Sequence, residues 1–197
     1  MKITPNELYH IYNQGNNHEQ LFFLAEDYIV FMRLFRKFVT GYCPPMAWCL
    51  MPNHFHFVIY TSDLSVEEKV IGNIFSNSLS NGFRLLQSAY AQYINAKRNR
   101  SGSLFRQKTK AKCLSEGDDH YALTAFHYVH QNPLNAGLVL RLEDWHYSSY
   151  RDYAGLREGN LCDKDLAAQL IGFNEKRFIE ESYEHIDQIL IKKIFLC

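Results

Sequence analysis

The chain lacks the features of a membrane or secreted protein. Its 197 residues contain no run of roughly eighteen apolar residues, the length at which a membrane-spanning helix is expected. The start, MKITPNELYH, has no charged segment, apolar stretch and small-residue cleavage site in the order of a secretory signal. We therefore expect a cytoplasmic protein. The 47% of hydrophobic residues is enough to build a buried core.

Cysteine is also scarce. The five cysteines form no CxxC pair, and an odd, scattered number fits reduced, buried thiols better than a disulfide framework or a zinc knuckle. The HExxH motif of zinc hydrolases is absent, and no carboxylate lies near the His54-Phe55-His56 pair in the sequence. A zinc hydrolase that uses water as its nucleophile is therefore disfavoured.

Acidic residues are missing from the middle of the chain. The formal net charge is zero, with 21 basic and 21 acidic residues, which at first argues against a nucleic-acid partner. Between residues 69 and 115, however, there is no Asp or Glu, so the remainder holds all 21 acids and only twelve bases. The basic residues of this segment are Lys69, Arg84, Lys97, Arg98, Arg100, Arg106, Lys108, Lys110 and Lys112. Such segregation is typical of a surface that contacts nucleic acid.

The spacing of apolar side chains predicts an α+β fold. Alternation and short apolar runs predict strands at residues 8–13, 46–51, 55–60 and 107–114. Helical spacing predicts helices at residues 26–41, 71–95 and 116–132, the last one stopped by Pro133. Helical spacing returns in residues 166–196, with an interruption near Gly172. We expect one domain over residues 1–153 and a helical extension over residues 154–197.

Two histidines lie one residue apart in a predicted strand. In MPNHFHFVI, strand alternation puts the imidazoles of His54 and His56 on one face. Two adjacent neutral imidazoles make half of a metal site. The alternative is a pair of polar positions on a solvated hairpin. Burial of Phe55, Phe57 and Ile59 on the other face and the sharp Pro-Asn entry favour the metal site.

A lysine-rich segment follows the second long helix. In RQKTKAKC the basic side chains alternate with small or apolar ones, so they share one face of a strand. The residues expected to contact DNA are Arg98, Arg100, Arg106, Lys108, Lys110 and Lys112. Lysines also commonly protect a solvated edge strand, which is the alternative. Tyr90, Tyr93 and Phe105 lie among these charges and could stack bases, although helical spacing favours packing for the two tyrosines.

Tyr128 and Asn132 lie four residues apart in HYVHQNP, which puts them on one face of a helical turn. From spacing alone, a tyrosine there is normally a packing residue. The segment has to be read together with four others, namely NQGNN, WCLMPNHFH, SGSLF and WHYSSY. In this order, the segments resemble the REP-associated tyrosine transposases, which belong with the small single-tyrosine HUH transposases of insertion sequences. The resemblance spans roughly residues 8–153.

The resemblance implies both a fold and a site. The fold is a ferredoxin-like or RRM-like antiparallel sheet with helices packed mainly on one face. His54, His56 and Asn132 match the ligands of a divalent metal, Mg or Mn, although such ligands also accept Zn, Ni or Co. Tyr128 matches the nucleophile, which forms a 5′-phosphotyrosine. The implied enzyme is a metal-dependent endonuclease and strand transferase, transposase-like, acting on hairpin-forming single-stranded DNA as a monomer or homodimer.

Several points stay open at this stage. A tyrosine hydroxyl has a pKa of about 10, so a neighbour must take its proton, and the nearest candidates in the sequence are His127, His130 and Gln131. Gln14 stands where relatives often have an arginine, so a phosphate contact expected there is weakened. The alternative function is a non-catalytic RRM-like module that binds single-stranded nucleic acid. The joint presence of both histidines with Tyr128 and Asn132 favours the enzyme.

Overall fold

The central element is a four-stranded antiparallel sheet. The computed structural model describes residues 1–115, 120–187 and 190–192, and its sheet has the order β2-β3-β1-β6. The strands are β1 (Leu8–Gln14), β2 (Pro45–Met51), β3 (His54–Tyr60) and β6 (Lys110–Cys113). Helices α1 (Ala25–Phe38) and α3 (Ser78–Lys97) connect them in the sequence β-α-β-β-α-β. This order is that of a ferredoxin-like fold, which confirms the predicted α+β class.

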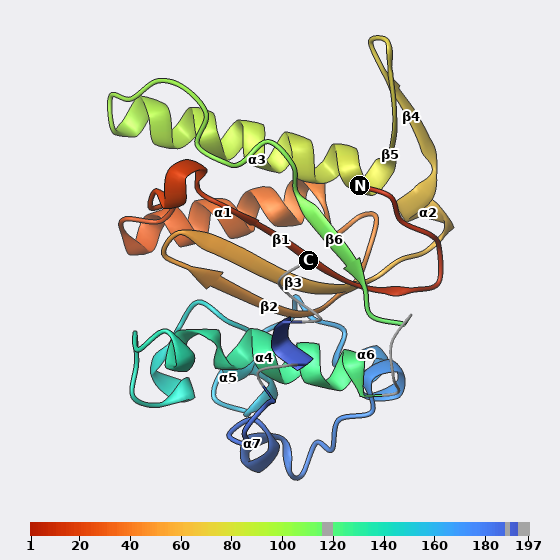
Figure 1. Ribbon diagram of the computed structural model, residues 1–197, viewed down its shortest axis with the longest axis vertical. Coiled ribbons are helices and arrows are strands. Elements are labelled where there is room, and N and C mark those ends of the chain that lie inside the picture. The colour runs from red at the N-terminus through yellow and green to blue at the C-terminus, as the bar shows by residue number, and fades with distance from the viewer. Residues whose placement is uncertain (116–119, 188–189, 193–197) are drawn as a thin grey trace.

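The two faces of the sheet bury different sets of side chains. On one face, Ile11, Phe55 and Phe57 pack with α1 and α3, as in the stack of Phe35 on Phe57 at 4.1 Å between ring centroids. The other face carries Val58, Ala47 and Leu8, which pack against a further helix, α4 (Tyr121–Asn135). Figure 1 shows α1 and α3 on one side of the sheet and α4 on the other.

The chain after the sheet forms the layer around α4. It comprises η2 (Leu142–Asp144), α5 (Tyr150–Tyr153), α6 (Lys164–Ile171) and α7 (Phe178–Glu181). Phe173 and Phe178 of this part are buried in one cluster with Phe126 of α4, and Phe126 stacks on Phe173 at 4.9 Å. The expected helical extension therefore shares its core with α4. The boundary at residue 153 stays a prediction.

Residues 68–77 form a hairpin where the spacing had predicted the start of a helix. Strands β4 (Glu68–Ile71) and β5 (Ile74–Asn77) pair antiparallel, and α3 begins only at Ser78. Gly72 has a φ of +60°, which suits the two-residue turn Gly72-Asn73 that joins the strands. The apolar positions fit a helical period and a strand period equally well, and the turn residues decided between them. In Figure 1 this hairpin projects from the body of the molecule.

Other predicted boundaries shift by a few residues. The strand predicted over residues 107–114 pairs only over Lys110–Cys113. Helix α4 continues through Pro133 to Asn135, beyond the predicted stop, because a proline in the last turn costs one hydrogen bond and the helix ends two residues later. The predicted start of that helix, at residues 116–119, lies outside the described residues. Short elements α2 (Asp63–Val66) and η1 (Asn16–His18) complete the fold.

Within residues 1–115, 120–187 and 190–192, no helix is both long enough and apolar enough to cross a bilayer.

Candidate functional site

The structure brings the four predicted site residues together where α4 crosses β3. The rings of His54 and His56 lie edge to face at 4.8 Å between centroids, and the ring of Tyr128 stands edge to face with His56 at 6.3 Å. The side chain of Asn132 lies close enough to that of His54 to act on its pKa. Two segments that are distant in the sequence, residues 54–56 and 128–132, are thus neighbours in the structure.

A turn before β3 fixes the position of His54. The backbone carbonyl of Pro52 accepts hydrogen bonds from the N–H groups of Leu21 and Phe22, at 2.8 and 3.0 Å, and the carbonyl of Asn53 accepts one from Gly15 at 2.8 Å. The Asn53 side-chain oxygen lies 2.7 Å from Nδ1 of His54. Because an amide oxygen only accepts, Nδ1 of His54 carries the proton and Nε2 keeps its lone pair.

Gly15, the residue that follows β1, has no room for a side chain. A Cβ added to Gly15 would stand 2.0 Å from the carbonyl oxygen of Glu19. The chain after β1 therefore folds back closely enough for η1 to support the turn before β3. Only glycine allows this approach.

The site histidines are held neutral by burial. Burial lowers the pKa of His54 to about 4, although the nearby Asn132 side chain acts in the opposite direction. The pKa of His56 lies well below its usual range, first because of burial and then because of His54 and His10. Neutral imidazoles are the form that binds a metal ion, so at neutral pH both side chains are in the protonation state that metal binding would require.

The donor set fits a divalent metal ion. Nδ2 of Asn132 donates to the backbone carbonyl of Tyr128 at 2.8 Å, so the amide end outside this bond is its oxygen. Together with the two imidazoles, this gives two nitrogen donors and one oxygen donor, which leaves positions for substrate and water. In the described part of the chain, no group of three or more His, Cys, Asp or Glu is arranged to hold a metal. A site here therefore depends on the Asn132 amide.

The sequence reasoning missed His10, which contacts this site from β1. Its Nε2 lies 2.8 Å from Nδ1 of His56, and the centroids of the two rings are 5.0 Å apart. Tyr12 stacks on His10 at 4.8 Å. The alternation of Leu8, His10 and Tyr12 in a predicted strand was the available signal, because it places these residues on one face. The sequence did not show that this strand lies next to β3.

The candidates for proton acceptor turn toward the C-terminal layer. Nδ1 of His127 lies 3.1 Å from the Ser182 hydroxyl, and Gln131 donates to the backbone carbonyls of Ser182 and Glu184. Nε2 of His130 lies 2.8 Å from the Ser149 hydroxyl. Burial raises the pKa of Tyr128, so its proton does need an acceptor. The three side chains thus have other hydrogen-bond partners, and their role as proton acceptor stays a prediction.

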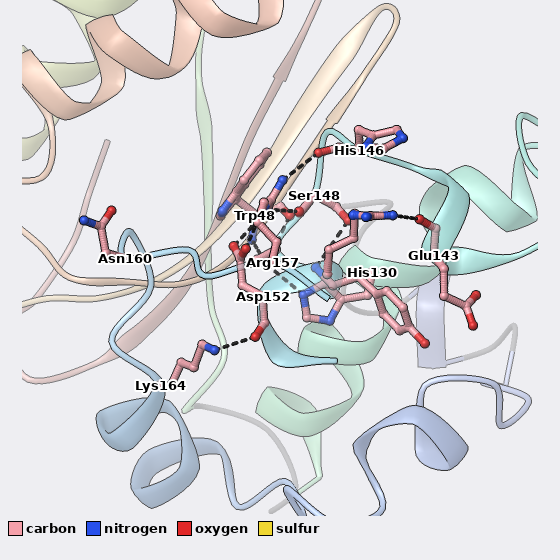
Figure 2. A network of polar contacts seen from close by, with 12 residues as sticks. Trp48, His130, Glu143, His146, Ser148, Asp152, Arg157, Asn160 and Lys164 are labelled. Carbon is pink, nitrogen blue, oxygen red and sulfur yellow. Dashed lines mark hydrogen bonds and ion pairs between the residues drawn. The ribbon is translucent and has the colours of Figure 1, made fainter. Parts of the chain in front are cut away.

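A polar network behind α4 fixes the segment to which His130 is bound. Arg157 donates to the carbonyls of His146 and Ser148 and forms an ion pair with Asp152. Figure 2 shows this network, with His130 pointing into it and Trp48 beside the Arg157 guanidinium. The segment pairs with β2, since Leu50 donates to the Tyr147 carbonyl at 2.8 Å. His130 therefore helps to anchor α4 against β2.

Two of the predicted DNA-binding lysines lie on the face of the sheet that carries His54 and His56, here called the histidine face. Lys110 is directly opposite Tyr12 in the β1–β6 register, and Lys112 is opposite His10. Residues opposite each other in an antiparallel pair project to the same side, so both lysines point to the side of His54 and His56. The side chain of Lys110 is exposed and that of Lys112 is half-buried. Lys108, exposed as well, precedes the strand.

The three arginines lie near the turns at the other end of β1. Arg106 contacts the side-chain amide of Gln14, which is opposite His54 in the register, and its guanidinium lies 3.2 Å from Nε2 of His18. Arg100 pairs with Glu19 at 2.6 Å. Arg98 stacks on Phe23 at 3.7 Å. Arg106 is thus near the site, while Arg98 and Arg100 already support neighbouring loops.

The aromatic residues among these charges belong to the core. Tyr90 is fully buried and donates its hydroxyl to the Leu21 carbonyl at 2.9 Å. Phe105 is 6% exposed and packs against Phe55, while the Tyr93 hydroxyl bonds to Asp27 at 3.1 Å. The packing interpretation of the two tyrosines is confirmed. Tyr12, which is half-buried on the histidine face, is the aromatic residue placed beside the candidate site.

Comparison with known proteins finds a structural likeness. The chain is similar in fold to a REP-associated tyrosine transposase whose structure was solved bound to a REP hairpin. The TM-score is 0.58 and the identity 17%, over 83% of this chain and 92% of that one. No family model and no curated protein matches the sequence. The likeness shows that the fold is shared. The roles of individual residues rest on the geometry described above.

Proposed function

We propose that this protein is a metal-dependent endonuclease and strand transferase, transposase-like, that acts on hairpin-forming single-stranded DNA. The observation that carries the proposal is the meeting of Tyr128 and Asn132 from α4 with His54 and His56 from β3. A half-buried tyrosine beside two neutral imidazoles and an amide is a nucleophile next to a set of metal ligands. The structural neighbour, a transposase bound to a REP hairpin, supports DNA as the substrate.

The chemistry follows from the tyrosine. Its hydroxyl oxygen attacks the phosphorus of one phosphodiester, and the bond from phosphorus to the 3′ oxygen breaks. The tyrosine gives up its proton, the 3′ oxygen takes one, and the protein remains joined to the 5′ phosphate. Because one phosphoester replaces another, a 3′ hydroxyl of a second strand can reverse the step and release Tyr128. The products are a cut or a transferred strand.

The residues around Tyr128 support this step. His54, His56 and Asn132 would hold a divalent ion, Mg or Mn, which when bound supplies positive charge to the phosphate under attack. Lys110 and Lys112 lie on the same face and would bind the neighbouring phosphates of the strand. Tyr12 would offer a base a surface to stack on. Both interactions are independent of sequence, so they would hold the strand without selecting it.

A covalent adduct is the direct test. Purified protein with Mn is mixed with single-stranded oligonucleotides that form hairpins and carry a label at the 3′ end, and the products are run on denaturing gels. We expect a labelled band at the mass of protein plus DNA for the wild type and none for Tyr128→Phe. Tyr121→Phe is the matched control, because Tyr121 lies two turns earlier on α4. It should form the adduct as the wild type does.

The result separates the two functions considered. If Tyr128→Phe forms as much adduct as the wild type, the nucleophile is another residue. If the wild type binds the oligonucleotides tightly but neither cuts them nor forms an adduct with Mn, the protein is an RRM-like binding module. Single-strand binding should persist in Tyr128→Phe under either function, because Lys110 and Lys112, here called the lysine face, are unchanged.

A further inference from the structure

We infer that His10 is a positioning residue that fixes His56 in the tautomer able to bind a metal through Nε2. The inference rests on the proposed function, since it assigns a role toward the same metal site. Nε2 of His10 lies 2.8 Å from Nδ1 of His56, and the planes of the two rings differ by only 14°. Both side chains are buried, at 0% and 7% exposure.

The hydrogen bond between two neutral imidazoles contains a single proton. If Nδ1 of His56 donates it, Nε2 of His56 carries no proton and is in the form that can bind a metal. If Nε2 of His10 donates instead, the other nitrogen of a neutral His56 carries a proton and cannot bind a metal. Only the first arrangement is compatible with the site. His10 must therefore be the acceptor.

His54 obtains the same tautomer by a different contact. The Asn53 side-chain oxygen accepts from its Nδ1 at 2.7 Å. The two candidate ligands thus each have an acceptor at Nδ1, one an amide oxygen and the other an imidazole nitrogen. Partners of this kind orient a metal-binding histidine and raise its basicity, and their loss typically weakens metal binding by about 10- to 100-fold.

The position of His10 in the sheet makes this contact rigid. His10 lies on β1, which pairs with β3 over seven consecutive residues, and its own register partners are Val58 and Lys112. Tyr12, on the same strand, stacks on His10 at 4.8 Å between ring centroids. A buried imidazole in this row has no packing advantage over an apolar side chain, because its polar atoms must be satisfied. A positioning role explains its presence.

Two measurements test the inference. Long-range nitrogen–proton NMR of the metal-free protein at neutral pH should show the proton of His56 on Nδ1. Calorimetric titration with Mn should give a dissociation constant about 10- to 100-fold higher for His10→Leu than for the wild type. His10→Gln keeps an acceptor within reach of Nδ1 and should recover most of the affinity. Rescue by glutamine is not expected from a purely structural side chain.

A core variant controls for lost stability. Ile11→Ala removes a fully buried side chain next to His10 that points to the opposite face of the sheet. It should lower the free energy of unfolding while leaving Mn affinity unchanged. If His10→Leu binds Mn like the wild type, the inference is wrong and the proposed function stands. If the proton of His56 sits on Nε2, the inference is also wrong, and the Mn titration of the wild type then decides whether the proposed metal site stands. If the wild type binds no Mn, the proposed metal site itself is wrong.

Discussion

Lowering the pH from 8 to 5.5 should destabilise the metal-free protein strongly, because four of its nine histidines are buried, and a fifth, His54, is half-buried, in the neutral form. Burial lowers the pKa of His10 to about 3 and those of His54 and His127 to about 4. It also holds the pKa values of His56 and His130 well below their usual range. In the unfolded chain, each would titrate near pH 6.5.

The sign and size of this pH effect follow from the numbers of protons that the unfolded and folded chains bind. Below pH 6.5 the unfolded chain takes up protons that the folded chain refuses, so stability is present above that pH and is lost as the pH falls. At pH 5.5 each such histidine favours the unfolded state by about 1.4 kcal/mol, and five together by about 7 kcal/mol. This is comparable to the whole stability of an ordinary domain, about 5–15 kcal/mol.

The assay is urea unfolding followed by tryptophan fluorescence at pH 8, 6.5 and 5.5, with a metal chelator present. His10→Gln removes one of the five groups and should reduce the pH dependence by about one fifth, while His146→Gln alters an exposed side chain and should leave it unchanged. A loss below about 1.5 kcal/mol between pH 8 and 5.5 would mean that at most one of the five histidines is held neutral, and would refute the reasoning.

Three further predictions concern the layer around α4 and the lysine face. Phe178→Ala removes a side chain that is 1% exposed and should lower the free energy of unfolding by about 3–5 kcal/mol, measured by urea unfolding, whereas Ile179→Ala at an exposed neighbour should cost little. Lys110→Gln should reduce the salt dependence of single-strand binding by about 0.7 in logarithmic slope, and exposed Lys176→Gln in the extension should not. Asn132→Ala should weaken Mn binding by at least tenfold in calorimetry, roughly the size of a lost ligand contact, without weakening single-strand binding in the absence of metal. A loss of stability under about 1 kcal/mol, an unchanged salt slope or an unchanged Mn affinity would contradict the three predictions in turn.

Local periodicity correctly predicted which of the candidate side chains share a face of one strand or one helix. Strand alternation put His54 and His56 on one face, and the four-residue interval put Tyr128 and Asn132 on one side of α4. Both relations depend only on backbone geometry, which the sequence determines over a few residues. The helix predicted from residue 71 was wrong up to residue 77, because Ile71, Ile74 and Phe75 satisfy both periods and the turn at Gly72 makes this segment a hairpin.

The resemblance supplied what periodicity could not. It predicted the ferredoxin-like sheet and the joint use of residues more than seventy positions apart, such as His54 and Tyr128. It gave no indication of His10, because the relevant fact is a contact between strands. It also did not indicate that His127, His130 and Gln131 serve the packing of α4 against the C-terminal layer.

By itself, the sequence determined the elements and the faces on which their polar residues lie. The pairing of β1 beside β3, which brings His10 to His56, and the crossing of α4 over the sheet, which brings Tyr128 and Asn132 to the histidines, were decided by the tertiary structure. The reason is that such contacts follow from how the two apolar faces of the sheet are buried, and burial involves the whole chain. Neighbouring residues can specify a strand or a helix, but only collective packing specifies what each of them meets.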